Sequence, residues 1–174
     1  GGQEGKTLDW DFVQSDPLMA MDHDGEAVTS IAFHPDGSIW ATASEEGVVW
    51  IWDIADVEAQ LVYSGTHHRN KRVTDIAFSP DGSVRVSGSL GEQANDNGTT
   101  LDGTIVFWEL TPDSLEGTPI LDYSGRVWSL AFHPDGSTLV SSDNAGAHHF
   151  WDVDSLQSTG MTISLPTGSV DLAY

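Results

Sequence analysis

The chain has 174 residues, with 27 acidic side chains against six basic ones, no cysteine and a formal net charge of −21. Nucleic-acid binding is disfavoured because phosphate contacts need a basic surface. No run of 18 apolar residues marks a membrane span, and without cysteine there is no disulfide. We expect a protein that binds neither nucleic acid nor membrane and lies in the cytoplasm.

The acidic residues are spread along the chain instead of forming blocks. Two explanations compete for this charge. One is adaptation to high salt, since the screening length falls to ~3 Å at 1 M and weakens self-repulsion. The other is a basic partner. The even spread favours the first, a halophilic-like surface.

Residues 1–22 predict the end of an incomplete unit, with one strand ending near Trp10 and a further strand after it. Residues 23–66 predict four strands, a to d, from apolar alternation and β-branched residues. These strands are Val28–Phe33, Ile39–Ser44, Val48–Trp52 and a weaker Gln60–Ser64. The turn after the first strand contains Pro35-Asp36-Gly37, in which Pro fixes φ and Gly accepts a positive φ. No window has a sustained helical period, so little or no helix is expected.

This unit repeats. The phrase VTSIAF-HPDG returns as VTDIAF-SPDG and VWSLAF-HPDG, and a final VDLAY begins it again at Val170. Tryptophans recur at positions 10, 52, 108 and 151, with spacings of 42, 56 and 43, each with a glycine five residues earlier. The repeated motif residues are Trp10, Trp52, Asp53, Trp108, Trp151 and Asp152, with turn residues Asp36, Asp81 and Asp135. A period of about 40–45 residues ending in Trp-Asp is typical of propeller blades.

On these motifs the chain, from Gly5 to Tyr174, resembles the WD-repeat β-propeller family. The resemblance implies an all-β fold of four-stranded antiparallel blades around a channel, and a role as a protein-interaction platform without catalysis of its own. The predicted division is 1–22, the end of a partial blade; 23–66, a blade; 67–122, a blade with an insertion at 90–102; 123–166, a blade; and 167–174, the first strand of another. The strand count leaves the propeller incomplete, so we expect part of a larger propeller, or copies that close a ring through open edges.

The family resemblance points to one rim of the disc, formed by the loops between strands d and a and between b and c, as the binding surface. Half of the basic residues lie there: Arg69, Lys71 and Arg72. The polar insertion with Asp96 and Asn97 lies in the same repeat. A recognition site for an acidic or polar segment is one interpretation; a basic turn that neutralises nearby acid is the other.

Three more residues are candidates for partner contact. Trp128 replaces Thr29 and Thr74 of the earlier repeats and stands near Arg126. Trp50 occupies a position that faces outward in relatives, so it marks either an interface or packing against an adjacent blade.

No metal or cofactor is expected. The insertion lacks the acidic first ligand of a calcium loop, since Gln93 stands there. The pair His148-His149 points to opposite faces of a strand, and His148 matches apolar positions, which predicts a hydrogen-bonded interior histidine. No nucleophile elbow, phosphate loop or zinc helix motif is present.

The family's internal hydrogen-bond network joins His, Ser or Thr, Asp and Trp. Here His23 stands one residue further from its strand than usual, and Ala145 replaces the Asp in the third repeat. We expect a distorted network in the first repeat and none in the third. The functional prediction is a non-catalytic scaffold that binds a protein or peptide on the loop rim. The alternatives are a regulatory propeller region of a signalling ATPase or kinase, and a self-assembling propeller subunit.

Overall fold

The computed structural model describes residues 6–10, 17–55, 59–66, 71–91, 103–111, 114–119 and 126–164. Within these ranges there are strands and turns but no helix, and accordingly no helix that could span a membrane. The strands form a two-stranded sheet, called here the N-terminal sheet, and three four-stranded sheets, called blades 1, 2 and 3. All pairings are antiparallel.

Each sheet follows the chain order of its strands. The N-terminal sheet pairs β1 (Lys6–Trp10) with β2 (Pro17–Asp22). Blade 1 contains β3 (Val28–Phe33), β4 (Ile39–Ser44), β5 (Val48–Asp53) and β6 (Gln60–Thr66). Blade 2 contains β7 (Val73–Phe78), β8 (Val84–Ser89), β9 (Ile105–Thr111) and β10 (Ser114–Pro119). Blade 3 contains β11 (Val127–Phe132), β12 (Thr138–Asp143), β13 (Ala147–Asp152) and β14 (Gln157–Ser164).

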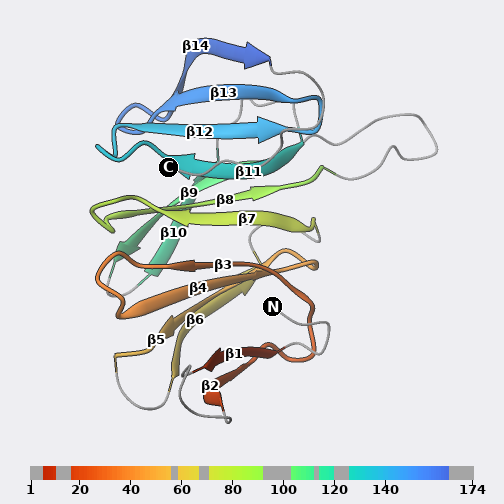
Figure 1. Ribbon diagram of the computed structural model, residues 1–174, viewed down its shortest axis with the longest axis vertical. Coiled ribbons are helices and arrows are strands. Elements are labelled where there is room, and N and C mark those ends of the chain that lie inside the picture. Colours follow the sequence, from red (N-terminus) through yellow and green to blue (C-terminus); the bar gives the residue numbers. More distant parts are fainter. Residues whose placement is uncertain are drawn as a thin grey trace, which may run out of the picture.

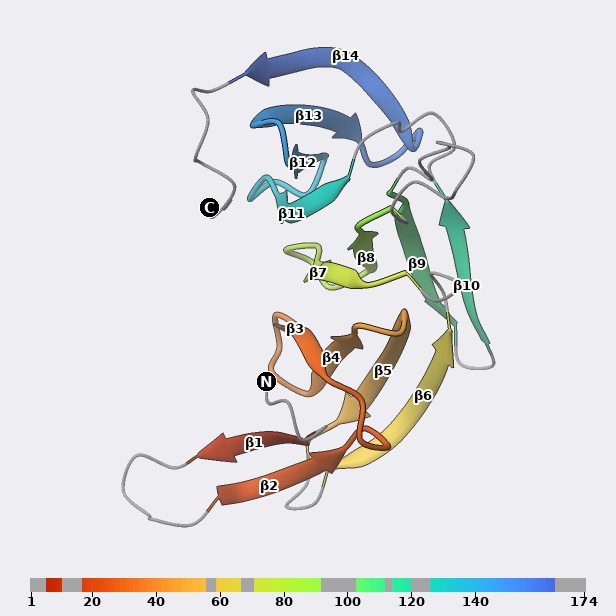
Figure 2. The same ribbon diagram turned by 90° about the vertical axis from the view of Figure 1, so that its right-hand side faces the viewer.

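The predicted strands of blade 1 are confirmed, except that the third and fourth extend further, to Asp53 and Thr66. Most of the insertion, residues 92–102, and the whole of 167–174 lie outside the described residues. The four sheets are stacked along an arc (Figures 1 and 2). The first strands of the blades, β3, β7 and β11, lie side by side on the inner side, and the fourth strands β6, β10 and β14 lie on the outer side.

The turns between the first and second strands owe their shape to the Pro-Asp-Gly motif. Gly37, Gly82 and Gly136 have φ between 75° and 77°, a backbone region that favours glycine. In blade 1 the Asp36 carboxylate accepts hydrogen bonds from the backbone N–H and hydroxyl of Ser38, at 2.8 and 2.6 Å. The repeated motif therefore closes each hairpin by the same local contacts.

Apolar cores form between blades as well as within them. One cluster joins Val49 and Ile51 of blade 1 to Val73 and Ile76 of β7, and an equivalent cluster joins blade 2 to β11. Gly88 permits the second contact, because a Cβ at this position would lie 2.3 Å from Cγ1 of Val127. Blades 1 and 2 thus each pack one face against the first strand of the next blade.

Polar contacts also tie the inner strands together. The Thr29 hydroxyl donates to the backbone carbonyl of Val73 at 2.6 Å, and the equivalent Thr74 donates to the carbonyl of Val127 at 2.9 Å. Asp75 of β7 bridges both neighbouring blades. Its carboxylate accepts from the Ser30 hydroxyl at 3.1 Å on one side, and from the Leu130 N–H at 2.8 Å and the Ser129 hydroxyl at 3.1 Å on the other.

The motif tryptophans make the same hydrogen bond in all three blades. The indole N–H of Trp52 donates to Thr42 at 3.0 Å, that of Trp108 to Ser87 at 2.9 Å, and that of Trp151 to Ser141 at 2.9 Å. The predicted distortion in blade 1 and loss in blade 3 are each seen only in part.

In blade 1 the His, Thr and Trp members are joined, because His23 Nε2 lies 2.8 Å from the Thr42 hydroxyl despite its displacement along the chain. Glu46, at the acidic position, is exposed. Blade 3 keeps the Ser–Trp bond, since this contact depends only on the pairing of β12 with β13, which places Leu139 opposite Trp151. Loss of the acidic member at Ala145 therefore does not remove the whole network.

Replacing Thr42 with Val tests this network. The isosteric change leaves the buried Trp52 N–H and His23 ring nitrogen without their shared hydroxyl. We expect a loss of about 3 kcal/mol in the free energy of unfolding, since each buried unsatisfied group costs roughly 1–3 kcal/mol. Denaturant titration measures it. The matched Ser141→Ala variant removes one such bond and should cost less; an equal or smaller loss in Thr42→Val would contradict the shared role.

Candidate functional site

The loop rim is the side of the stacked blades at which each first strand begins and each second strand ends. Its described residues are 23–27, 71–72 and 126 before the first strands, and 45–47, 90–91, 103–104 and 143–146 between the second and third strands. Arg69, Asp96 and Asn97, which were predicted to form part of the site, lie outside the described residues. Lys71 is half-buried on this rim.

Arg72 is engaged in local charge compensation. Its Nη1 lies 2.9 Å from Oε1 of Glu45 in the neighbouring turn of blade 1, with both side chains about half exposed. The Arg72 carbonyl also accepts from the Leu90 N–H at 3.1 Å. The sequence allowed two interpretations of this basic turn, recognition of a partner and neutralisation of nearby acidic residues. For Arg72 the ion pair with Glu45 corresponds to neutralisation. An exposed pair of this kind contributes little to stability.

Arg126 holds the same place in blade 3 that Arg72 holds in blade 2, directly before the first valine of the inner strand. The turn residue equivalent to Glu45 in blade 2 is Leu90, because both follow the last serine of the second strand. The side chain of leucine can neither accept a hydrogen bond nor neutralise a cation. The carboxylate that pairs with Arg72 therefore has no counterpart at the equivalent position beside the half-buried Arg126.

Trp128 is the large exposed aromatic residue next to Arg126. Its side chain is 45% exposed, although it lies in an inner strand whose other residues are buried. The equivalents Thr29 and Thr74 use their hydroxyls to bind a carbonyl of the following blade. The threonine hydroxyl is attached to Cβ, whereas the N–H of an indole lies at the far side of the ring. Trp128 therefore does not repeat this contact.

Trp50 does not belong to the exposed surface. It is 3% exposed and packs with Met21, Trp40 and Trp52. Its ring also makes an edge contact with His23, with centroids 4.9 Å apart. Of the two interpretations, the structure shows packing against the adjacent sheet, and the physical reason is that the N-terminal sheet covers this face of blade 1.

His148 is interior, as predicted, but it is not hydrogen-bonded: within the described part of the chain neither ring nitrogen has a partner. The prediction of a hydrogen-bonded histidine was therefore wrong in that respect. The equivalent residues Val49 and Ile105 lie in the apolar clusters between blades. His148 occupies a place that the fold makes apolar.

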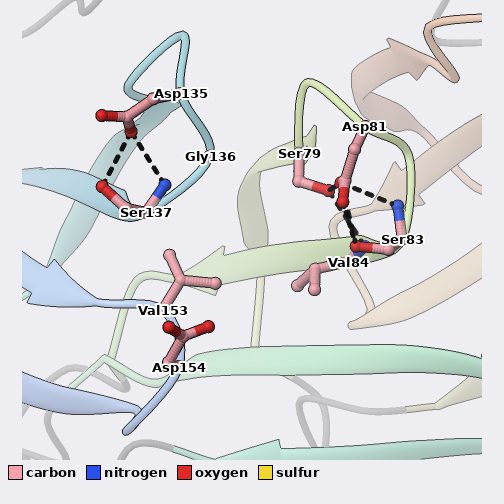
Figure 3. Close-up of a pocket in the computed structure, with 9 residues that line it drawn as sticks. All are labelled: Ser79, Asp81, Ser83, Val84, Asp135, Gly136, Ser137, Val153 and Asp154. Carbon is pink, nitrogen blue, oxygen red and sulfur yellow. Dashed lines mark hydrogen bonds between the residues drawn. The ribbon is translucent and has the colours of Figure 1, made fainter.

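A pocket of about 270 Å³ lies on the opposite rim, between the hairpin turns of blades 2 and 3 (Figure 3). It is lined by Ser79, Asp81, Ser83, Val84, Asp135, Gly136, Ser137, Val153 and Asp154. Hydrogen bonds from Ser79 and Ser83 lower the pKa of Asp81 to about 2, and those from Ser137 and His133 do the same for Asp135. In the described residues, no group of three His, Cys, Asp or Glu side chains could hold a metal ion.

The turn aspartates predict a pH dependence. Asp36, Asp81 and Asp135 all have pKa values of about 2, below their ordinary value. Their contribution to stability is therefore present above the unfolded pKa of about 4 and is lost as the pH falls through about 2. Denaturation midpoints at pH 5, 4 and 3 should fall in the wild type and fall less in a triple Asp→Asn variant, whose amide oxygen still accepts the serine bonds. Parallel curves would contradict this origin.

Two groups escaped the sequence reasoning. Asp75 stands where the other repeats have Ser30 and Ser129, and that substitution was its only signal. Burial raises the pKa of Asp75, although hydrogen bonds from Leu130, Ser30, Ser129 and Ile76 act in the opposite direction. Arg85 stands where Trp40 and Leu139 stand in the other blades, and it is 2% exposed.

Comparison with known proteins agrees with this architecture. The family described as "WD domain, G-beta repeat" matches residues 16–53, 59–109 and 117–152, which is more than half of the chain. The chain is 29% identical over 135 residues to "Target of rapamycin complex subunit wat1" of Schizosaccharomyces pombe, covering 78% of this chain and 38% of that protein. It is 24% identical over 147 residues to mouse "Striatin" and 31% identical over 132 residues to bovine "Transducin beta-like protein 3".

These alignments cover 73% and 76% of this chain but only 17% and 15% of those two proteins. The chain thus spans well under half the length of each of these relatives. Each matched repeat contains the first three strands of one blade, with its Trp–Ser or Trp–Thr hydrogen bond, and begins with residues of the last strand of the sheet before it. The chain belongs to the WD-repeat family of β-propeller proteins.

Proposed function

We propose that this chain is a non-catalytic scaffold segment that binds a peptide segment of a protein partner on the loop rim, at Trp128 and Arg126. The observation that carries this proposal is the exposure of Trp128 in an otherwise buried inner strand. Large aromatic residues supply much of the binding energy at protein interfaces because they bury a large area with few rotatable bonds.

The neighbouring Arg126 adds a charged donor whose equivalent ion-pair partner is missing from the repeat, since Leu90 replaces the glutamate. A fitting peptide carries an apolar or aromatic residue for the indole and a carboxylate or carbonyl for the guanidinium. Trp128 and Arg126 lie two residues apart, at the start of β11, so one short segment can reach both.

The relatives support an interaction role. One of them is by its name a subunit of a protein complex, and the three blades of this chain share the repeat that matches the family. The absence of enzymatic activity belongs to the same proposal, and the cytoplasmic location stays a prediction. Arg69, Lys71, Asp96 and Asn97 extend the proposed surface along the rim.

A peptide library displayed on phage and selected against the immobilised chain tests this proposal. We expect the enriched peptides to combine an apolar residue with an acidic or polar one. Trp128→Thr, which restores the residue of the other repeats, should weaken binding of an enriched peptide at least about tenfold, equal to 1.4 kcal/mol. Fluorescence polarisation with a labelled peptide measures the affinity.

Leu61→Thr is the matched control, because Leu61 is similarly exposed but lies on β6, away from the rim. Its affinity should equal that of the wild type. Unchanged binding in Trp128→Thr, or a selection that enriches no peptide, would contradict the proposed site.

A further inference from the structure

One residue of the repeated hairpin turn differs between the blades. The turn begins with His34 in blade 1 and His133 in blade 3, but with Ser79 in blade 2. The imidazole of His34 reaches blade 2 and packs on Gly82, where an added Cβ would overlap the ring. An added Cβ at the equivalent Gly136 would have its nearest described neighbour 3.7 Å away. The smaller serine therefore leaves open, between blades 2 and 3, the space that an imidazole fills between blades 1 and 2.

This space is the pocket of about 270 Å³ on the rim opposite to the loop rim. Its base is apolar, because Val84 and Val153 line it and also pack on the core cluster between blades 2 and 3. Three carboxylates surround it: Asp81 and Asp135 from the two turns, and Asp154 from the segment after β13 (Figure 3). An apolar base with carboxylates around it fits a long cationic side chain, whose stem is apolar and whose head is charged.

Some carboxylate oxygens at the pocket are available to a ligand. The carboxylate of Asp81 is held by hydrogen bonds from the serines of its own turn, which fix its position. Oδ1 of Asp135 accepts from Ser137 at 2.7 and 2.9 Å, whereas its Oδ2 accepts no hydrogen bond from the described residues. Neither carboxylate oxygen of Asp154 accepts one from that part of the chain. The pocket thus combines fixed charges with unused acceptors.

The rim around the pocket is acidic throughout its described turns, residues 34–38, 53–55, 79–83, 133–137 and 152–156. These turns contain no lysine or arginine. Their acidic residues are the aspartates at positions 36, 53, 81, 135, 152 and 154. In contrast, Lys71, Arg72 and Arg126 lie on the loop rim, and Arg85 is buried. This separation of charge favours a positively charged partner at the acidic rim.

We propose that the acidic rim binds a basic segment of a partner protein and that an arginine side chain of this segment occupies the pocket beside Ser79. The arginine stem lies on Val84 and Val153, and the guanidinium donates hydrogen bonds to Asp135 and Asp154. A guanidinium suits this place because its planar donors pair with carboxylates and it is weakly hydrated. The site is separate from the peptide site at Trp128 and Arg126, which lies on the other rim.

NMR titration of the full chain with the peptide acetyl-Gly-Arg-Gly-amide tests the proposal. We expect saturable shifts confined to the backbone amides of residues 79–84, 135–137 and 153–154. The matching citrulline peptide has nearly the same shape without the charge and should cause no shifts. Raising the salt concentration from about 0.1 M to about 1 M should weaken binding of the arginine peptide, because the screening length falls from about 10 Å to about 3 Å.

Two variants act on the pocket by different routes. Ser79→His introduces the residue of the other two blades, and the pair of His34 with Asp36, 2.7 Å apart, shows that the turn accommodates it. We expect the imidazole to fill the pocket and abolish the shifts. Asp154→Asn keeps the shape and removes one charge. It should weaken binding roughly threefold to fivefold, the range expected for an exposed ion pair.

Asp53→Asn is the matched control, because it removes one charge from the same rim but does not line the pocket. Its affinity should equal that of the wild type, and thermal denaturation shows that the variants are folded. Equal weakening by Asp53→Asn and Asp154→Asn would indicate diffuse attraction and overturn the proposal. No shifts with the arginine peptide, equal shifts with the citrulline peptide, or shifts at residues 126–128 instead would overturn it as well.

Discussion

Replacing Asp75 with Ala is expected to lower the free energy of unfolding by about 3–4 kcal/mol, since hydrogen bonds to a charged group contribute about 1.5–3 kcal/mol each and are only partly replaced by water. The carboxylate is the acceptor for Ser30 of blade 1, for Ser129 and Leu130 of blade 3, and for its neighbour Ile76. Its removal breaks hydrogen bonds that join three inner strands. Guanidinium titration measures the loss.

Single changes at the partners serve as controls. Ser30→Ala and Ser129→Ala each remove one donor and should each cost about 1 kcal/mol. A double-mutant cycle between Asp75 and either serine should show a coupling energy, because the groups are in direct contact. A loss of less than 1 kcal/mol in Asp75→Ala would mean that water replaces the carboxylate and that the bridge is not structural.

The same residue predicts a pH effect opposite to that of the turn aspartates. Because burial raises the pKa of Asp75 in the folded chain, protonation of its carboxyl adds stability that is fully present below the unfolded pKa of about 4 and is lost as the pH rises through the folded value. The hydrogen bonds that the carboxyl accepts are present in both protonation states. The isosteric and neutral Asp75→Asn variant does not titrate. The stability difference between the wild type and Asp75→Asn should therefore change between pH 4 and pH 7, and a constant difference would contradict the raised pKa.

Replacing Arg85 with Leu is expected to raise the free energy of unfolding by about 1–3 kcal/mol, because removing a buried unpaired charge in favour of a well-packed apolar side chain is stabilising. Arg85 is 2% exposed, and its Nε and Nη1 have no hydrogen-bond partner within the described residues. Its main contact is with the ring of Phe78, 5.1 Å from the centroid. Burial lowers the pKa of Arg85 to about 10, as expected for a desolvated cation.

The repeat itself suggests the substitution, since Leu139 occupies this position in blade 3 and is completely buried. Arg85→Lys is the matched control: it keeps the charge, loses the planar stacking on Phe78 and should destabilise the fold. Denaturation midpoints rank the three proteins. A large loss of stability in Arg85→Leu would show that the guanidinium has an anionic partner.

The turn chemistry and the strands could be predicted because they depend on neighbours in the chain. Pro-Asp-Gly turns close by contacts two residues apart, as between Asp36 and Ser38. The strands of blade 1 follow from local apolar alternation. The family followed from the spacing of the tryptophans, which the matched repeats confirm.

The candidate site was less accessible to such reasoning. The sequence made both Trp50 and Trp128 candidates for partner contact, and for Trp50 it left packing against an adjacent blade open. One of them is buried because the N-terminal sheet packs over it, whereas the other is 45% exposed in an inner strand whose other residues are buried. Whether a tryptophan is covered depends on a second sheet, which no local pattern reports.

The charges show the same division. The sequence alone determined the repeat, the all-β class, the hairpin turns and the strongly acidic composition, because each depends on residue type and on spacing along the chain. Only the tertiary structure decided that Arg72 pairs with Glu45 and that Asp75 joins three blades. It also decided that Nε and Nη1 of Arg85 and both ring nitrogens of His148 are buried with no hydrogen-bond partner among the described residues. These outcomes depend on the separation in space of residues from different blades, and the packing of one sheet on the next sets that separation.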